Sequence, residues 1–166
     1  MSKITKRLLI GGLLAMVAAL PFNTMAGEAL SRVVDFKVLK VGMSGGQPPM
    51  NTVNRDGGLM GFDVDLAKAM AAAMKVQLDI KVMPFGELMT ALEEDKVDMV
   101  ISGMAITPER TEMASFVGPY MVSGKSILTK SDTIAKITAQ EEVNRDNLKL
   151  AALKNSTSAS FVSTVA

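Results

Sequence analysis

Alternation between short apolar runs and helix-like periodicity is the feature that most constrains this chain. The pattern predicts strands at 37–42, 76–82 and 98–101, and helices at 62–74 and 85–94. The predicted elements are separated by only a few residues, which is typical of parallel strands joined by crossover helices. The sequence therefore predicts an α/β fold in which helices flank a parallel sheet.

The first predicted helix, 62–74, has two acidic residues near its start. We expect Asp63 to be the N-cap residue, while Asp65 places negative charge in the first turn, where it suits the helix dipole. The alternative is an acid–base pair of carboxylates, but the start of a helix favours the capping interpretation. Residues 56–58 are predicted to form a hairpin tip just before this helix.

The stretch 97–120 contains the residues with the clearest binding chemistry. Its apolar run ends at Ser102 and Gly103, and a glycine lets the backbone approach a ligand closely. Arg110 follows in the next loop, with a planar fork of donors that matches both oxygens of a carboxylate. Open α/β sheets bind ligands beyond the carboxyl ends of their strands. We therefore predict that Arg110 binds the carboxylate of a small solute; the alternative is a surface arginine paired with a neighbouring glutamate.

The second half of the chain has a different pattern. Strands are expected at 126–129 and 148–153, with a short helix at 139–143 and a last helix at 158–165. The run Asn155-Ser156-Thr157 is typical of an N-cap that opens the last helix.

The first 26 residues have the parts of a secretory signal peptide. Basic residues among the first seven positions precede an apolar run at 8–20, which is too short for a comfortable membrane span. Small residues then predict cleavage after Ala26; the alternatives are an uncleaved anchor or a buried core helix. Cleavage would leave the mature protein in an extracytoplasmic space, most simply the periplasm of a two-membrane bacterium.

The composition excludes several classes of chemistry. The formal net charge is +1, which gives no general attraction to nucleic acid. The sequence has neither cysteine nor histidine, so it lacks disulfides, thiolate nucleophiles, the commonest general base and the commonest metal ligand. We therefore expect no catalytic residue, no metal site and no cofactor. With 14 methionines and no tryptophan, methionine is expected to fill much of the core.

Several strings of the sequence together resemble a known family. The chain resembles the periplasmic solute-binding proteins of ABC importers, family 3, which are polar amino-acid binders with a type II two-lobed fold. The matching strings are GFDVDLA at 61–67, VD at 97–98, SG at 102–103, ITPER at 106–110, and SF at 115–116 followed by PY at 119–120. Their order and separation make the resemblance specific, and it extends from about residue 39 to residue 157.

The resemblance implies a role for several residues. Arg110 matches the arginine that grips the α-carboxylate of the ligand, and Ser102 and Gly103 match residues that complete this grip. Ser156 and Thr157 match a turn whose amides, at a helix N-terminus, bind the same carboxylate from the other lobe.

Two further residues are assigned to the ligand side chain. Phe85 matches an aromatic residue that packs on the ligand, with a core position as the alternative. Gln47 stands in the first loop, where the family commonly has other residue types, and it is expected either to contact the ligand or to be an ordinary polar loop residue. Because Ser44, Met50 and Ala105 also depart from the family pattern, the resemblance does not name the ligand.

The resemblance also implies a division of the chain. Residues 1–26 are the signal peptide, 37–119 the N-terminal part of lobe 1, 120–124 the hinge crossing, and 125–166 the start of lobe 2. The second lobe is incomplete, because the family continues through it and returns to lobe 1. The chain is therefore expected to be a truncated gene product or a fragment.

The function implied is that of an extracytoplasmic receptor, not an enzyme. It would deliver a small amino acid or related carboxylate to the permease of an ABC importer in the inner membrane, and it would bind no nucleic acid. Three alternatives stay open: a dehydratase-like periplasmic enzyme of the same fold, a sensory input module, and a fragment that binds nothing tightly. The absence of histidine and cysteine argues against the enzyme.

Overall fold

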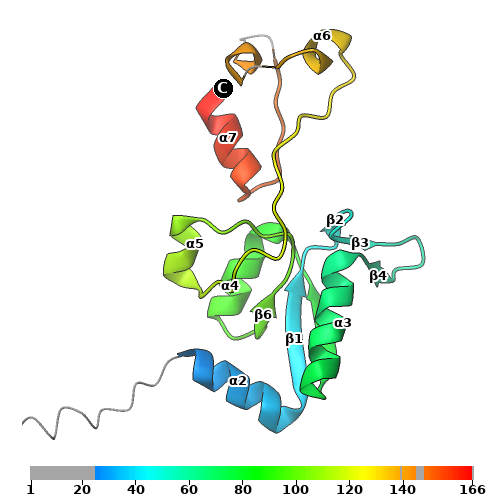
Figure 1. Ribbon diagram of the computed structural model, residues 1–166, viewed down its shortest axis with the longest axis vertical. Coiled ribbons are helices and arrows are strands. Elements are labelled where there is room, and N and C mark those ends of the chain that lie inside the picture. Colours follow the sequence, from blue (N-terminus) through cyan, green and yellow to red (C-terminus); the bar gives the residue numbers. More distant parts are fainter. Residues whose placement is uncertain (1–24, 139, 145–147, 166) are drawn as a thin grey trace, which may run out of the picture.

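The structure is a computed structural model that describes residues 25–138, 140–144 and 148–165 (Figure 1). The apolar run of the predicted signal peptide lies outside these residues. In chain order the elements are α2 (Met25–Phe36), β1 (Val38–Met43), β2 (Gly46–Gln47), β3 (Asn51–Val53), β4 (Leu59–Met60), α3 (Phe62–Met74), β5 (Gln77–Val82), the 3₁₀ helix η1 (Phe85–Glu87), α4 (Leu88–Glu93), β6 (Met99–Val100), α5 (Pro108–Met113), α6 (Asp132–Ala135), the 3₁₀ helix η2 (Gln140–Val143) and α7 (Thr157–Val165).

Three parallel strands form the central sheet, in the order β5-β1-β6. Strand β1 pairs with β5 along its whole length, from Val38 opposite Gln77 to Met43 opposite Val82. On its other side β1 pairs with the short β6, where Val41 lies opposite Met99. The parallel sheet and its crossover helices are thus as predicted, with strand boundaries that differ by one residue. Helix α4 begins at Leu88, three residues after the predicted start, because residues 85–87 form the 3₁₀ helix η1.

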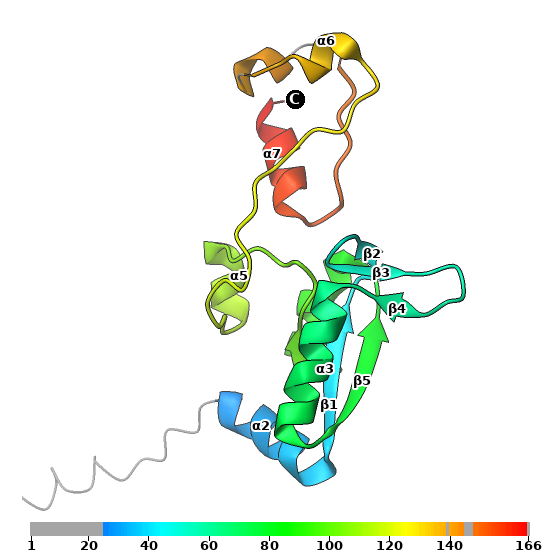
Figure 2. The same cartoon turned by 45° about the vertical axis from the view of Figure 1, so that its right-hand side comes forward.

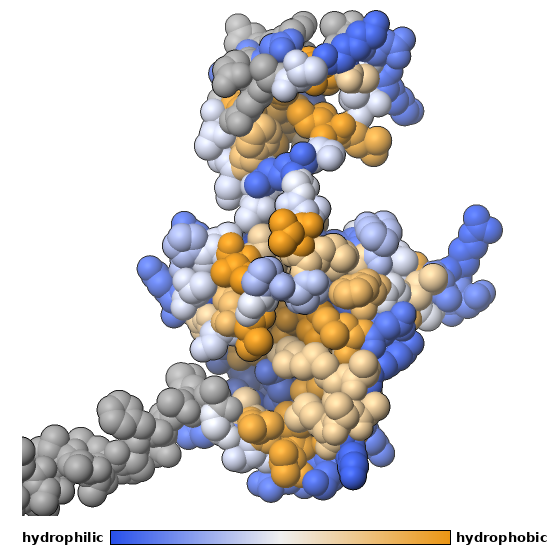
Figure 3. All heavy atoms as spheres, in the orientation of Figure 1, coloured by the Kyte–Doolittle hydropathy of each residue, from blue (hydrophilic) through white to orange (hydrophobic). Residues whose placement is uncertain are grey.

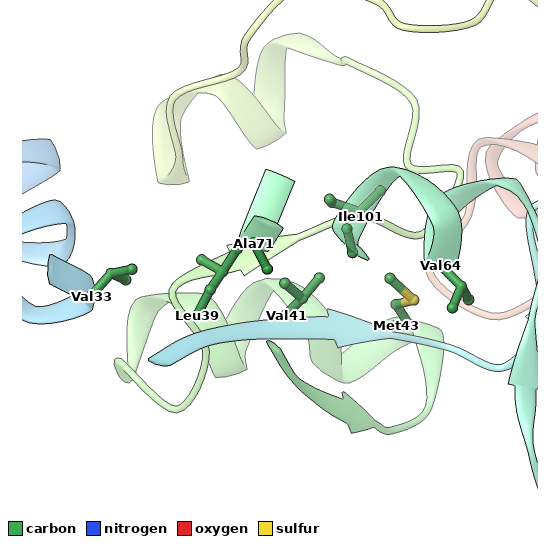
Figure 4. Close-up of a cluster of buried hydrophobic side chains, with 8 residues drawn as sticks. Val33, Leu39, Val41, Met43, Val64, Ala71 and Ile101 are labelled. Atoms are coloured by element: carbon green, nitrogen blue, oxygen red, sulfur yellow. The ribbon is translucent and has the colours of Figure 1, made fainter. Parts of the chain in front are cut away.

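The alternating side chains of β1 create a core on one face of the sheet (Figure 4). Leu39, Val41 and Met43 point to this face, where they meet Val64 and Ala71 of α3. Further residues of the same core are Val33, Ala67 and Ile101. Small and branched side chains therefore fill most of it, and Met43 is the only methionine among the fully buried residues of the described chain. Met70, Met74 and Met99 pack against this core and are partly exposed, so the prediction that methionine fills the core is confirmed only in part.

Helix α4 covers the other face of the sheet. Gly42 of β1 has no side chain, so Leu88 of α4 approaches the strand closely; a Cβ at Gly42 would lie 3.1 Å from Leu88 Cδ2. Leu88, Ala91 and Val97 are buried on this side. The close approach brings the start of α4, and the 3₁₀ turn η1 before it, to the carboxyl end of the sheet.

A small antiparallel sheet, β2-β3-β4, precedes α3 and contains the predicted hairpin tip. The N-cap of α3 is Gly61, with φ of 131°, and not Asp63 as predicted. A Cβ at Gly61 would lie 2.4 Å from the Met50 carbonyl oxygen, so only glycine fits. Asp63 lies inside the first turn, and its carboxylate accepts hydrogen bonds from residues distant in sequence instead of capping the helix.

Helix α2 was not predicted and lies at the amino end of the sheet. Val33 of α2 is buried in the core, and Arg32 forms ion pairs with Asp95 at 2.9 Å and Asp98 at 3.1 Å. The helix includes Ala26, and cleavage after that residue stays a prediction. Among the described residues, no helix has the length and apolar character needed to cross a membrane.

Beyond α5 the chain leaves the part of the molecule that contains the sheet (Figures 1 and 2). We call residues 25–113 the sheet unit, residues 114–131 the crossing segment, and the described residues of 132–165 the C-terminal region. The C-terminal region contains α6, η2 and α7, which lie together above the sheet unit in both views. Helix α7 was predicted to within one residue; η2 corresponds to the helix predicted at 139–143, of which Ala139 lies outside the described residues.

The prediction of two strands after residue 120 was wrong. Residues 126–129 and 148–153 form no strand. A strand requires a neighbouring strand to complete its hydrogen bonds, and the described chain offers none at either place. Instead the crossing segment is irregular and exposed, with Val117, Val122 and Leu128 at 95%, 89% and 101% exposure. Apolar side chains also reach the surface of the sheet unit (Figure 3).

Candidate functional site

The predicted binding residues of the sheet unit lie beyond the carboxyl ends of the three parallel strands. Ser44 follows β1, Phe85 follows β5, and Ser102 with Gly103 follows β6. Because parallel strands end at one edge of the sheet, residues far apart in sequence come together there. The structure places them in two neighbouring clusters, one of buried polar groups and one around Arg110.

The polar cluster is built on the hydroxyl of Ser102, which is fully buried. This oxygen accepts a hydrogen bond from the Ser44 amide at 2.9 Å and lies 3.3 Å from Nδ2 of Asn51, which donates to it. It donates in turn to Oε1 of Gln47 at 3.0 Å. Ser102 and Gln47 are thus brought together as predicted candidates, but the Ser102 hydroxyl is fully used within the protein.

Asn51 and Asp63 extend this cluster and were missed as site residues by the sequence interpretation. Both are fully buried. Asn51 accepts from the Gly45 amide at 2.7 Å and donates through Nδ2 to Asp63 Oδ2 at 2.7 Å. No buried side-chain nitrogen or oxygen in the described part of the chain lacks a hydrogen-bond partner. The first loop is therefore fixed in place by satisfied hydrogen bonds, which preorganises the edge of the sheet.

Tyr120 of the crossing segment closes the polar cluster. Its hydroxyl donates to Asp63 Oδ1 at 2.9 Å and accepts from the Gly103 amide at 3.2 Å. The ring stacks on Phe62, with centroids 6.0 Å apart and an interplanar angle of 18°. Burial raises the pKa of Tyr120 to about 12, and the charge of Asp63 and the hydrogen bond to it act in the same direction. The phenol therefore stays protonated and remains a donor at neutral pH.

Gly103 itself has a backbone that suits a glycine. Its φ is +54°, in the left-handed region that other residues rarely adopt. A Cβ at this position would meet the side chain of Met50 at 3.4 Å and Gln47 Oε1 at 3.8 Å. In this conformation the Gly103 amide donates to the Tyr120 hydroxyl, and a role of Gly103 in ligand binding stays a prediction.

Arg110 organises the second cluster. It lies in α5, whose N-cap Thr107 accepts a hydrogen bond from the Arg110 amide and whose first position is Pro108, a residue suited to a helix start. The guanidinium donates through Nη1 to the Ala105 carbonyl at 2.8 Å and through Nη2 to the Asn155 carbonyl at 2.9 Å. Arg110 thus connects the sheet unit with the C-terminal region.

The guanidinium of Arg110 is partly desolvated and has no ion-pair partner within the described ranges. Neither Glu109 nor Glu112, its predicted alternative partners, forms an ion pair with it in these ranges. Burial lowers the pKa of Arg110, and the charge of Glu109 partly opposes this shift. An arginine nonetheless remains cationic at neutral pH. Its positive charge is therefore available to an anion.

The ring of Phe85 packs against the Arg110 guanidinium. The Arg110 guanidinium carbon lies 5.6 Å from the centroid of the Phe85 ring, a cation–π arrangement. Phe85 is also buried in the core of the sheet unit. The structure thus brings Phe85 together with Arg110 and gives it a core position, which was the alternative expected for this residue.

Ser156 and Thr157 lie at the start of α7, next to Asn155. The Ser156 hydroxyl accepts a hydrogen bond from the Ala159 amide at 3.1 Å, so it caps the helix as predicted. Asn155 has φ of 58°, and its side chain lies against Gly86, where a Cβ would be only 2.7 Å from Asn155 Nδ2. The N-terminus of α7 therefore faces the same loops as Arg110. The contact of Asn155 was not foreseen.

The described residues contain no group of three or more acidic side chains arranged to bind a metal ion. The groups at the edge of the sheet are instead a guanidinium, a glycine amide, a glutamine amide and the positive end of a helix, together with the Asp63 carboxylate, whose two oxygens already accept hydrogen bonds from Asn51 and Tyr120. Apart from Asp63, these groups are all suited to an anion such as a carboxylate.

Comparisons with known proteins agree on the kind of chain this is. Residues 39–163 match the family model of the bacterial extracellular solute-binding proteins, family 3. The ABC transporter arginine-binding protein 1 of Escherichia coli K12 is 34% identical over 121 residues, which cover 73% of this chain and 46% of that protein. The chain therefore spans about half the length of the curated relatives that it matches.

Solved structures give the same result. The ancestral amino acid-binding protein AncCDT-1, a precursor of cyclohexadienyl dehydratase, is 33% identical with a TM-score of 0.75, and the match covers 86% of this chain and 61% of that one. The arginine-bound form of domain 1 of ArgBP from T. maritima is 42% identical with a TM-score of 0.53, over 54% of this chain and 71% of that one.

Proposed function

The chain belongs to the bacterial extracellular solute-binding proteins, family 3, and on this premise we propose that it binds a small amino acid or related carboxylate for delivery to an ABC-type importer. Its fold is that of the type II periplasmic binding proteins, of which it covers a part. Relatives that bind arginine make a basic amino acid the first ligand to test.

The observation that carries the proposal is the position of Arg110. Its charge is held between the sheet unit and the start of α7, on the ring of Phe85, without an ion pair within the described residues. A ligand carboxylate would supply the missing anion. It could replace water around the guanidinium and would gain from the partly desolvated surroundings, where a charge pair is stronger than in bulk water.

The other candidates contribute to the same carboxylate or to the rest of the ligand. The Thr157 amide would add the positive end of the nine-residue helix α7. The Ser156 amide, which donates to the Leu153 carbonyl at 3.3 Å, would exchange that acceptor for the ligand carboxylate. Gly103 would donate its backbone amide. The Gln47 amide nitrogen, at the edge of the polar cluster, would meet a polar group of the ligand.

Two candidates take a more indirect part in this proposal. The hydroxyl of Ser102 is used by Ser44, Asn51 and Gln47, so Ser102 would position the first loop and Gly103. Phe85 would orient the Arg110 fork and present any free part of its ring to the ligand. Both effects would raise affinity by preorganisation, since a fixed site loses less entropy on binding.

The proposal includes the division of the chain and its location. Residues 37–119 would form the N-terminal part of lobe 1, 120–124 the hinge crossing and 125–166 the start of lobe 2. Residues 1–26 would direct the chain to the periplasm and be removed there, and the bound form would meet the permease in the inner membrane. Binding without catalysis is favoured because the sequence lacks histidine and cysteine and the buried Asp63 is already hydrogen-bonded on both oxygens.

A thermal-shift panel tests the proposal. The chain from residue 27 onward is melted with each common amino acid, with small carboxylates, and with agmatine, which is arginine without its carboxylate. A ligand at one hundred times its Kd stabilises the folded state by about 2.7 kcal/mol, which corresponds to several degrees in Tm. We expect an amino acid to raise Tm and agmatine to have little effect. A panel in which no compound raises Tm would contradict the proposed function.

The proposed location has its own test. The full chain is produced in a two-membrane bacterium, and the protein from the periplasmic extract is weighed by mass spectrometry. We expect the mass of a chain whose first residue is Gly27. The variant Ala26→Pro should block this cleavage and leave the mass of the full chain. An unprocessed chain in the cytoplasm would contradict secretion without bearing on ligand binding.

A further inference from the structure

The Gly103 amide, which the proposed function offers to a ligand, already has an acceptor within the protein. This acceptor is the hydroxyl oxygen of Tyr120, at 3.2 Å. The single proton of the phenol is directed to Asp63 Oδ1 at 2.9 Å, so the phenol oxygen is free to accept from Gly103. The two hydrogen bonds form one relay from the loop after β6 to the start of α3.

The relay is also an attachment point of the crossing segment. Tyr120 lies in that segment, whereas Gly103 and Asp63 belong to the sheet unit. Stacking on Phe62 adds to the attachment, while neighbours of Tyr120 such as Val117 and Val122 are almost fully exposed. Tyr120 is thus a residue through which the side chains of the crossing segment contact the polar cluster of the candidate site.

A carboxylate is a better partner for the Gly103 amide than the phenol. Charge-assisted hydrogen bonds are roughly twice as strong as those between neutral groups. The ligand would therefore gain a stronger bond, while the protein would lose a weaker one. Asp63, fully buried and bonded also to Asn51, would keep its hydrogen bond from Tyr120 in either state.

We propose that Tyr120 competes with the ligand carboxylate for the Gly103 amide, so that ligand binding releases one of the bonds that attach the crossing segment to the sheet unit. This inference rests on the proposed function and adds a positioning residue to it. The exchange would connect occupation of the site with movement of the C-terminal region. No other side chain of the described residues accepts a hydrogen bond from the Gly103 backbone amide.

The first test removes the competing hydroxyl. Tyr120→Phe keeps the ring and its stacking but leaves the Gly103 amide without its protein acceptor. Because a neutral hydrogen bond contributes modestly, we expect L-arginine to bind this variant roughly two- to tenfold more tightly than the wild type in calorimetry. Val122→Ala is the matched control, since it changes an exposed side chain of the same segment and keeps both the Tyr120 hydroxyl and its stacking, and its Kd should stay within about twofold of the wild type.

The second test needs no variant, and so does not depend on the folding of Tyr120→Phe. The chain has one tyrosine and no tryptophan, so fluorescence excited near 280 nm, where phenylalanine does not absorb, comes from Tyr120 alone. L-arginine should change this fluorescence and shift the Gly103 amide resonance in a ¹⁵N–¹H spectrum. Agmatine, which has no carboxylate, should leave both unchanged at the same concentration.

The outcomes separate this inference from the function on which it rests. Equal or weaker binding by Tyr120→Phe, or an unchanged Gly103 resonance when L-arginine is bound, would overturn the competition and leave the receptor function intact. If neither protein binds L-arginine or any other amino acid of the panel, the proposed function fails and this inference fails with it. Tighter binding by Tyr120→Phe with an unchanged Kd for Val122→Ala supports both.

Discussion

The sheet unit and the C-terminal region differ in how their apolar residues are covered. In the sheet unit, α3 and α4 cover the two faces of β1, and side chains such as Val41 and Leu88 have no exposed surface. Among the described residues of the C-terminal region, only Val143 and Val165 are buried hydrophobic residues. The comparison indicates that the sheet unit has its own core, while the C-terminal region contributes a helix terminus to the site without a comparable core.

Substitutions of apolar side chains should lower the free energy of unfolding much more in the sheet unit than outside it. Leu88→Ala removes a fully buried side chain between α4 and the sheet, so the free energy of unfolding should fall by about 2–5 kcal/mol. Leu128→Ala removes a fully exposed side chain of the crossing segment and should change the free energy of unfolding by less than about 0.5 kcal/mol. Urea titrations followed by circular dichroism measure both values. Similar losses for the two variants would show that the comparison is wrong.

The pKa of the single tyrosine, measured by titration, tests whether the crossing segment is attached to the sheet unit. Absorbance near 295 nm should show a pKa of about 12 for Tyr120, compared with 10.0 for an ordinary tyrosine. Between these values the folded phenol keeps a proton that the unfolded chain releases, so stability should fall as the pH rises from about 10 to about 12. Asp63→Asn should lower the pKa only in part, because burial is the larger cause. A pKa near 10 in the still folded protein would place Tyr120 in solvent.

Removal of a helix cap should have a smaller effect on stability, and this effect should also differ between the two parts of the molecule. Thr107→Ala in α5 and Ser156→Ala in α7 each remove a side chain that accepts from a helix amide, at a cost of about 1 kcal/mol. We expect Thr107→Ala to lower the urea midpoint, because α5 belongs to the sheet unit. Ser156→Ala should instead accelerate hydrogen exchange within α7 and leave that midpoint unchanged. Equal shifts of the midpoint would mean that the two parts unfold as one.

The same division explains which structural predictions succeeded. Helix α3 and the three parallel strands depend on periodicity within short segments, which the sequence displays directly. The strands predicted at 126–129 and 148–153 had suitable composition, but a strand also needs a partner, and composition does not reveal one. Helix α2 was missed because its first residues overlap the predicted cleavage site at Ala26.

The candidate site was predictable in its residue types and not in its contacts. Arg110 and Gly103 were recognised from their chemistry and from the family resemblance. The capping role of Asp63 was inferred from its place near a helix start, but its partner Tyr120 lies 57 positions away in sequence. The hydrogen bond from Arg110 to Asn155 spans 45 positions. Such contacts depend on the packing of distant segments, which local patterns do not encode.

If Arg110 binds a ligand carboxylate, removing its guanidinium should weaken binding, and calorimetry with two arginine variants measures this loss. L-arginine is titrated into the wild type, into Arg110→Ala, and into Arg55→Ala, which removes an exposed arginine of the hairpin as a matched control. Loss of a desolvated charge pair should cost at least about 2 kcal/mol, so Kd should rise by roughly 30-fold or more for Arg110→Ala and stay unchanged for Arg55→Ala. Binding of L-arginine to Arg110→Ala with the wild-type Kd would contradict the account.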